Sequence, residues 1–256
     1  MTHTYKNTPI HYNVTGTGPT MVLLHGFLER STMWDRYVPS LSEKFTVITI
    51  DFPGHGKSGV ISGTHTMELM AKVVKSVLNE AGIASATLVG HSMGGYVALA
   101  YTELFEAEVE KLILLNSTPL ADSEARKQNR KRALKVMDYN AEAFISMAIT
   151  NLFPEKSRQH FVSDIEALKN AALQFPVAGI QAAIRGMIDR KDRTDILAHF
   201  SKKKTMVCGK EDPLMPIAES KAISEKTNTR FIELEGGHMS WLENSYEIYN
   251  ILHFIE

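Results

Sequence analysis

One serine of this sequence, Ser92, is well suited to covalent chemistry. It lies in the segment 90–95 (GHSMGG), after an apolar run at 86–89 and before a segment of helical periodicity. Glycines on both sides of a serine allow a sharp turn from a strand into a helix, and this turn exposes the hydroxyl at the helix N-terminus. The free N–H groups there favour a developing negative charge. We therefore predict that Ser92 is a nucleophile.

A serine hydroxyl is a weak nucleophile at neutral pH, so it needs a general base and a carboxylate that orients this base. His238 follows the apolar run 230–234, within the segment GGHMS. Asp212 follows the run 205–208, within the segment GKEDP. Both residues come directly after predicted strands, as Ser92 does. We predict that His238 is the base and that Asp212 orients it.

Acyl transfer also requires donors for the oxyanion of the tetrahedral intermediate. The segment His25-Gly26-Phe27 ends another apolar run, and its glycine permits a close approach of the backbone. We expect the backbone N–H groups of Phe27 and Met93 to supply this oxyanion hole. Three more histidines lie in these loops, and a structural role is favoured for each of them: His25, His55 and His91.

Several strands and helices must alternate to position these loops. Apolar residues run consecutively at 20–24, 46–50, 86–89, 111–115, 205–208 and 230–234, which is typical of strands that are covered on both faces. Amphipathic segments at 67–81, 93–105, 217–226 and 241–255 predict helices between them, the last with a capping box at Ser240. This alternation indicates an α/β fold with a mostly parallel sheet. Residues 9–14 and the strand at 20–24 read as an antiparallel hairpin.

Residues 119–199 interrupt the alternation, because they show helical periodicity and no good strand. Their densest basic run, 126–132 (RKQNRKR), is interpreted as a solvated helix face, with an anion site as the alternative. The Phe and Met residues of the segment are expected mainly to pack it onto the body of the protein. Phe144 and Met147, together with His25, are also candidates for contact with the substrate.

Composition excludes several classes of function. With 256 residues, 44% hydrophobic and 22% charged residues, the chain is typical of one globular domain, and its net charge of −1 gives no reason to bind nucleic acid. The single cysteine, no signal-peptide pattern and no membrane-spanning run predict a cytoplasmic protein without membrane partners. No metal-ligand or phosphate-loop motif is present, so we expect no cofactor and a small-molecule substrate. Monomer and homodimer both remain open.

Together these motifs resemble the α/β-hydrolase family, on the segments 25–27, 51–58 and 90–95 and on Asp212 and His238. The order Ser, Asp, His is that of the family's catalytic triad. The resemblance implies an eight-stranded, mostly parallel sheet built from residues 1–118 and 200–256. It also implies that residues 119–199 form a helical cap within the same catalytic unit.

Three functions are compatible with this resemblance. The leading hypothesis is a serine hydrolase that cleaves a carboxylic ester, thioester or lactone through an acyl-enzyme on Ser92. The second is an enzyme of C–C bonds, either a hydrolase or a lyase similar to the pyruvate-eliminating synthase of the menaquinone pathway. That synthase holds carboxylates with arginines, for which Arg126, Arg130 and Arg132 are candidates. The third is a ligand receptor or stress-response regulator with a slow triad.

Overall fold

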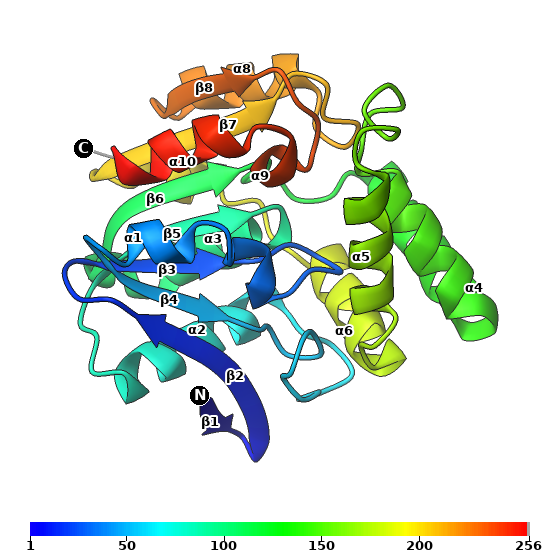
Figure 1. The fold of residues 1–256 in the computed structure, drawn as a ribbon, viewed down its shortest axis with the longest axis horizontal. Coiled ribbons are helices and arrows are strands. Elements are labelled where there is room, and N and C mark those ends of the chain that lie inside the picture. The colour runs from blue at the N-terminus through cyan, green and yellow to red at the C-terminus, as the bar shows by residue number, and fades with distance from the viewer. Residues whose placement is uncertain (255–256) are drawn as a thin grey trace.

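A sheet of eight strands runs through the centre of the protein in the computed structural model, which describes residues 1–254 (Figure 1). Its spatial order is β1-β2-β4-β3-β5-β6-β7-β8. Strands β3 to β8 are parallel, whereas β1 and β2 are antiparallel to their neighbours. The strands are β1 (Thr2–Tyr5), β2 (Thr8–Thr15), β3 (Thr20–Leu24), β4 (Thr46–Ile50), β5 (Ala86–His91), β6 (Val109–Leu115), β7 (Lys203–Gly209) and β8 (Arg230–Leu234). The predicted α/β class with a mostly parallel sheet is confirmed.

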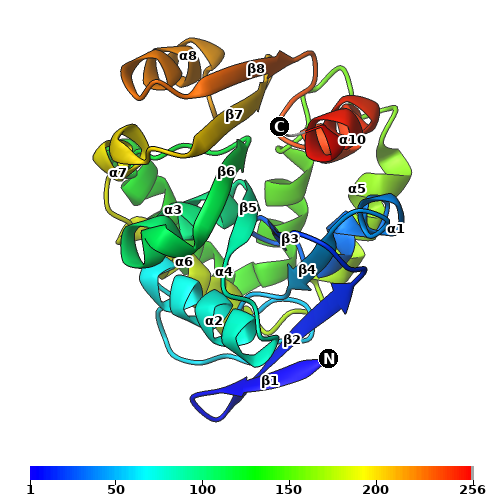
Figure 2. The same ribbon diagram turned by 90° about the vertical axis from the view of Figure 1, so that its left-hand side faces the viewer.

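Helices cover both faces of this sheet, which explains the consecutive apolar residues of its central strands. In β3 and β4, four of the five residues are buried. Figure 2 shows α1 and α10 on one side of the sheet and α2, α3 and α8 on the other. The helices are η1 (Ser31–Trp34), α1 (Val38–Leu41), α2 (Met67–Glu80), α3 (Met93–Phe105), η2 (Glu106–Glu108), α4 (Glu124–Thr150), α5 (Val162–Ala172), α6 (Val177–Ile188), α7 (Thr194–His199), α8 (Ile217–Lys226), α9 (Ser240–Glu243) and α10 (Ser245–His253).

The predicted hairpin of residues 9–14 with the next strand is wrong. Strand β2 does enter the sheet antiparallel, but it pairs with β1 and β4, while β3 lies beyond β4. The hairpin turn is formed instead by Lys6 and Asn7, whose φ angles of 48° and 61° suit a tight two-residue connection. The glycine-rich loop at 16–19 therefore crosses to the far side of β4 and does not reverse the chain into its neighbour.

The single C-terminal helix predicted over 241–255 is in fact two helices, α9 and α10, and Ile255 lies outside the described residues. The break is at Asn244, with φ −127° and ψ 42°. The capping box at Ser240 is also wrong, because Met239 is the N-cap and makes no side-chain capping bond. The hydroxyl of Ser240 donates to Asn116 Oδ1 instead, so a tertiary contact replaces the local cap.

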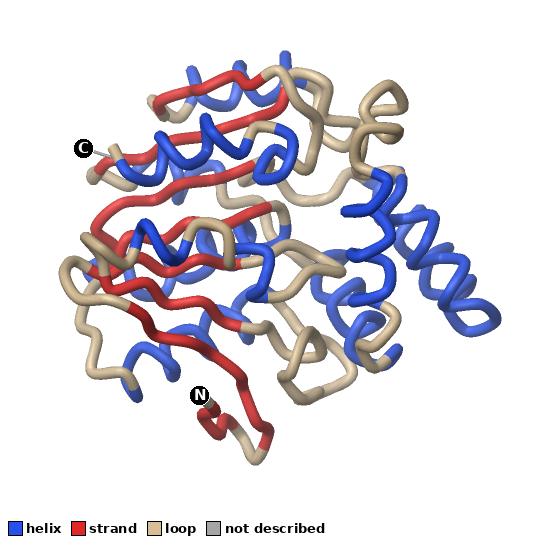
Figure 3. Tube along the Cα trace, in the orientation of Figure 1, coloured by secondary structure: helices blue, strands red, loops and turns tan. Residues whose placement is uncertain are grey.

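Helices α4 to α7 connect β6 to β7, and Figures 1 and 3 show α4, α5 and α6 beyond the C-terminal ends of the parallel strands. Helix α4 begins after Ser123, whose hydroxyl accepts the N–H of Arg126. It is kinked at Asn140, with φ −153° and ψ 79°, and the Asn140 side chain caps the next turn by accepting the N–H of Ala143 at 2.9 Å. Among the described residues, no helix is both long and apolar enough to cross a membrane.

Candidate active site

Ser92 occupies the turn between β5 and α3 in a strained conformation, with φ 50° and ψ −114°. Its N–H donates to the carbonyl oxygen of Leu115 at 2.9 Å. A Cβ atom at Gly90 would overlap the backbone of Gly94, and one at Gly94 would overlap the carbonyl group of Leu24. Only glycine therefore lets α3 begin this close to β5 and β3. The predicted turn is present, and it places Ser92 at the helix N-terminus.

Two hydrogen bonds join Ser92, His238 and Asp212. His238 Nε2 is 2.9 Å from Ser92 Oγ, and His238 Nδ1 is 2.7 Å from Asp212 Oδ2. His238 comes from the loop between β8 and α9, and Asp212 from the loop after β7. Since the carboxylate accepts the proton of Nδ1, the neutral ring presents an unprotonated Nε2 to the serine hydroxyl. The structure thus brings together the three residues that the sequence singled out.

Asp212 is buried and remains a carboxylate because every side of it receives a donor. Its Oδ1 accepts the N–H groups of Leu214 and Met215, at 2.8 and 3.1 Å. Burial alone would raise the pKa of Asp212, but the His238 ring, the Asn116 amide and the Leu214 N–H together hold this pKa below its ordinary value.

Asn116, at the end of β6, is a site residue that sequence reasoning missed. Its Nδ2 donates to Asp212 Oδ2 at 2.9 Å and to the Gly237 carbonyl oxygen at 3.0 Å. It therefore ties the carboxylate to the loop of His238. Its φ of 44° is a conformation that asparagine tolerates better than most residues. The only signal in the sequence was its position directly after a predicted strand.

The two N–H groups expected to form an oxyanion hole are both available. Met93 is the first residue of α3, where a helix leaves its N–H groups without an internal acceptor. Phe27 follows the end of β3. Within residues 1–254, neither N–H donates to another protein group.

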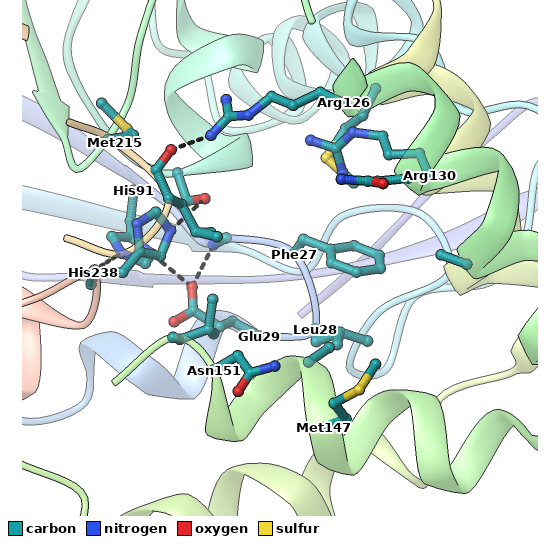
Figure 4. Close-up of a pocket in the computed structure, with 18 of the residues that line it drawn as sticks. Phe27, Leu28, Glu29, His91, Arg126, Arg130, Met147, Asn151, Met215 and His238 are labelled. Carbon is teal, nitrogen blue, oxygen red and sulfur yellow. Dashed lines mark hydrogen bonds and ion pairs between the residues drawn. The ribbon is translucent and has the colours of Figure 1, made fainter. Parts of the chain in front are cut away.

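A pocket of about 340 Å³ opens onto Ser92 and His238 between the sheet and α4 (Figure 4). Phe144 and Met147, the two cap residues predicted to contact a substrate, both line it. His25 does not line it, so that candidate is wrong. The ring of His25 is buried, its Nδ1 donates to the Gly26 carbonyl oxygen and its Nε2 accepts the N–H of Phe52, so both nitrogens serve the backbone.

A family model described as the alpha/beta hydrolase fold matches residues 19–245, which is most of the chain. The protein belongs to the α/β-hydrolase family. A structure of a thermophilic esterase from Thermogutta terrifontis, with malate bound, superposes with a TM-score of 0.90 at 31% identity, over 96% of this chain and 92% of that one.

Curated relatives of this α/β-hydrolase match it over different lengths. A pimeloyl-[acyl-carrier protein] methyl ester esterase from Vibrio vulnificus is 26% identical over 248 residues, which are 92% of this chain and 93% of the relative. An uncharacterized protein of Mycobacterium tuberculosis is 34% identical over 106 residues. The match covers 41% of this chain and only 31% of that relative.

A buried ion pair in this α/β-hydrolase, between Glu29 and His91, links the loops around Ser92. Glu29 Oε2 accepts from His91 Nδ1 at 2.8 Å and from the N–H of Gly26 at 2.6 Å. Glu29 Oε1 accepts from Trp241 Nε1 at 3.0 Å. The structural role expected for His91 is consistent with this arrangement. Glu29 was missed, because nothing in its local sequence indicates a buried carboxylate.

The basic run of α4 is only partly a solvated face. Arg132 is exposed, as expected, whereas Arg126 and Arg130 line the pocket. Residues four positions apart share one side of a helix, so these two arginines extend in the same direction, and Arg132 points elsewhere. The sequence could not show which side of α4 meets the core.

Proposed function

We propose that this α/β-hydrolase is a serine hydrolase that cleaves a carboxylic ester through an acyl-enzyme on Ser92. One observation carries the proposal: the hydrogen-bonded chain from Ser92 Oγ through His238 to Asp212, at the mouth of a pocket of substrate size. The similarity to a thermophilic esterase and to a methyl ester esterase supports a hydrolase that acts on esters. A 2-hydroxy-6-oxononadienedioate/2-hydroxy-6-oxononatrienedioate hydrolase from Paraburkholderia phymatum is 31% identical over 66% of this chain, so a C–C bond hydrolase is the second candidate.

In the proposed reaction, Ser92 Oγ attacks the ester carbonyl carbon while its proton moves to His238 Nε2. The N–H groups of Phe27 and Met93 receive the oxyanion of the tetrahedral intermediate, and the N-terminus of α3 adds a favourable dipole. His238 then returns the proton to the departing alcohol oxygen, which leaves the acyl group on Ser92. Asp212 holds the Nδ1–H tautomer throughout and stabilises the imidazolium.

A water molecule completes the cycle by the same route. It loses a proton to His238 Nε2 as its oxygen attacks the acyl carbon, and the proton passes to Ser92 Oγ as the carboxylic acid departs.

We also propose that residues 119–199 act as a cap of this catalytic unit, with residues 1–118 and 200–256 as its core; the last two residues lie outside the described part. The support is that residues of α4, among them Phe144, form one wall of the pocket.

The test compares the wild type with Ser92→Ala on 4-nitrophenyl butyrate, and follows covalent labelling by a fluorophosphonate with mass spectrometry. Loss of a triad serine lowers kcat by about 10⁴- to 10⁶-fold. We expect labelling at Ser92 and loss of turnover, with an unchanged thermal melt.

Three outcomes would contradict the proposal. Turnover by Ser92→Ala above a few per cent of wild type would remove Ser92 from the mechanism. Negligible ester cleavage together with cleavage of a carboxylated diketone would favour the C–C bond enzyme. Labelling followed by a single turnover would favour a receptor with a slow triad.

A further inference from the structure

The lining of the pocket above Ser92 combines two kinds of chemistry. Part of it is apolar and includes Phe27, Phe144 and Met147. Another part carries the guanidinium groups of Arg126 and Arg130. In Figure 4 both side chains extend from α4 toward the centre of the pocket, on the side opposite Met147. Such a pocket suits a ligand that is apolar along its length and negatively charged at one end.

The guanidinium of Arg130 makes a hydrogen bond through only one of its three nitrogens, within the described residues. Its Nε donates to Asp122 Oδ2 at 2.5 Å, and Asp122 Oδ1 lies 2.6 Å from Arg190 Nη1. One buried carboxylate is therefore shared by two guanidinium groups, so it cannot neutralise both. Within residues 1–254, the terminal nitrogens of Arg130 have no hydrogen-bond partner, although each carries two N–H donors.

Arg126 has no ion-pair partner in the described part of the chain. Its Nη2 donates to the carbonyl oxygen of Leu214, in the loop that contains Asp212. This bond fixes the guanidinium at the pocket wall and leaves its charge uncompensated.

The other carboxylates near the pocket cannot supply the missing charge. Glu29 is paired with His91, and Asp212 is paired with His238. Arg190, behind the wall, adds positive charge, since its guanidinium carbon lies 4.0 Å from the ring centroid of Tyr96, which lines the pocket. An anion bound in the pocket would supply the partner that this cluster lacks.

We infer that the substrate carries a carboxylate on an apolar chain, which Arg126 and Arg130 bind while the ester group lies at Ser92. This inference rests on the proposed function, because it names the substrate class of the same site. The carboxylate can belong to the acyl chain or to the alcohol, and the two arms of the experiment distinguish these sources.

The experiment measures kcat/KM for matched pairs of charged and neutral esters at fixed ionic strength. The acyl arm compares the mono-4-nitrophenyl ester of adipic acid with 4-nitrophenyl hexanoate. The alcohol arm compares 6-(butanoyloxy)hexanoate with hexyl butanoate. Each pair is tested on the wild type and on Arg126→Gln, Arg130→Gln and Arg132→Gln. The last is the matched control, because Arg132 belongs to the same helix and is exposed.

In at least one arm we expect the wild type to prefer the charged ester. Loss of a charge-assisted hydrogen bond should lower the charged-to-neutral ratio of kcat/KM about 10- to 150-fold in Arg126→Gln or Arg130→Gln. Arg132→Gln should leave this ratio within about twofold. Arg130→Gln breaks the ion pair with Asp122, so this variant can fail to fold. In that case the test uses Arg130→Lys, which retains the charge, and Arg126→Gln, which breaks no ion pair.

A wild type that prefers the neutral ester in both arms would overturn the inference, and the Ser92-dependent cleavage of neutral esters would still stand. An equal effect of Arg132→Gln would also overturn it, because the cause would then be general surface charge. If no ester is cleaved, the proposed function fails and the subsite is judged by calorimetry of adipate binding to Ser92→Ala. Adipate binding that Arg126→Gln weakens at least tenfold supports the subsite, and no binding overturns it.

Discussion

His91 Nε2 donates a hydrogen bond of 2.9 Å to the backbone carbonyl oxygen of His238. Its Nδ1 faces Glu29 Oε2 at the same time, so both ring nitrogens meet groups that only accept. This arrangement favours the protonated ring beside an ionised Glu29. Burial alone would lower the pKa of His91, but Glu29 raises it above the ordinary value, and the pKa of Glu29 is lowered in return. The loop of His238 is thus anchored to the residue next to Ser92.

We predict that Glu29 and His91 stabilise the fold as a unit. Removing one partner of a buried ion pair costs up to about 3–5 kcal/mol, because the other partner is left without compensation. Glu29→Gln and His91→Gln should each lower the free energy of unfolding within that range. The double variant should lose less unfolding free energy than the sum of the losses in the two single variants, by at least about 1 kcal/mol. Urea unfolding measures all four proteins, and strict additivity would show that the two residues act independently.

Asn116→Asp should impair turnover more than substrate binding. The change keeps the side-chain shape but places a second acidic group against Asp212, which loses a donor and the charge environment that orients His238. We expect kcat to fall about 10-fold or more while KM changes little. The matched control is Asn228→Asp, which alters another asparagine with positive φ, located before β8. Equal losses in both variants would mean that the effect is not local to the site.

Asp212→Asn should lower kcat about 10⁴-fold, as the comparable change does in serine proteases. The amide has nearly the volume of the carboxylate but cannot stabilise an imidazolium. Thermal melts should show a folded protein, since Asn can still accept the N–H groups of Leu214 and Met215. Retention of more than about a tenth of the wild-type kcat would contradict the assignment of Asp212.

The free energy of unfolding should decrease as the pH falls from about 6 to 5. Burial lowers the pKa of His55 to about 3 and that of His65 to about 4, whereas an unfolded chain titrates histidine near 6.5. The unfolded state therefore binds more protons in this window, which favours unfolding by up to about 1.4 kcal/mol per pH unit for each histidine.

Urea unfolding at several pH values measures this slope. His65→Gln keeps an acceptor for the N–H groups of Ile61 and Ser62 but cannot titrate, so its slope should be shallower. A stability that is constant or rises as the pH falls would contradict the prediction.

Much of the fold could be predicted because buried parallel strands have a local signature. The runs at 20–24 and 46–50 coincide with β3 and β4, since a strand covered on both faces needs apolar residues without alternation. The run at 230–234 coincides with β8, which lies at the edge of the sheet and buries only Leu234. The loops at the strand ends then indicated where Ser92 and His238 would lie.

Partners that are distant in the sequence could not be predicted. The pairing of β2 with β4, and not with β3, depends on how a loop crosses the sheet, and residue types do not record this. Glu29 and Asn116 are ordinary polar residues until the fold buries them against His91 and Asp212. Likewise, the direction of Arg126 and Arg130 is set by the side of α4 that meets the core.

The kink at Asn140 divides the pocket wall of α4 into two parts. Arg126 and Arg130 lie before it and are tied to Leu214 and Asp122, whereas the apolar wall residues of α4 that follow the kink make no such polar attachment. Because the backbone leaves helical geometry at Asn140, a change of volume in the second part need not displace the first. Substitutions in 141–150 could therefore change the length of substrate chain that the pocket prefers. They would leave the recognition of the anionic end of the substrate unchanged.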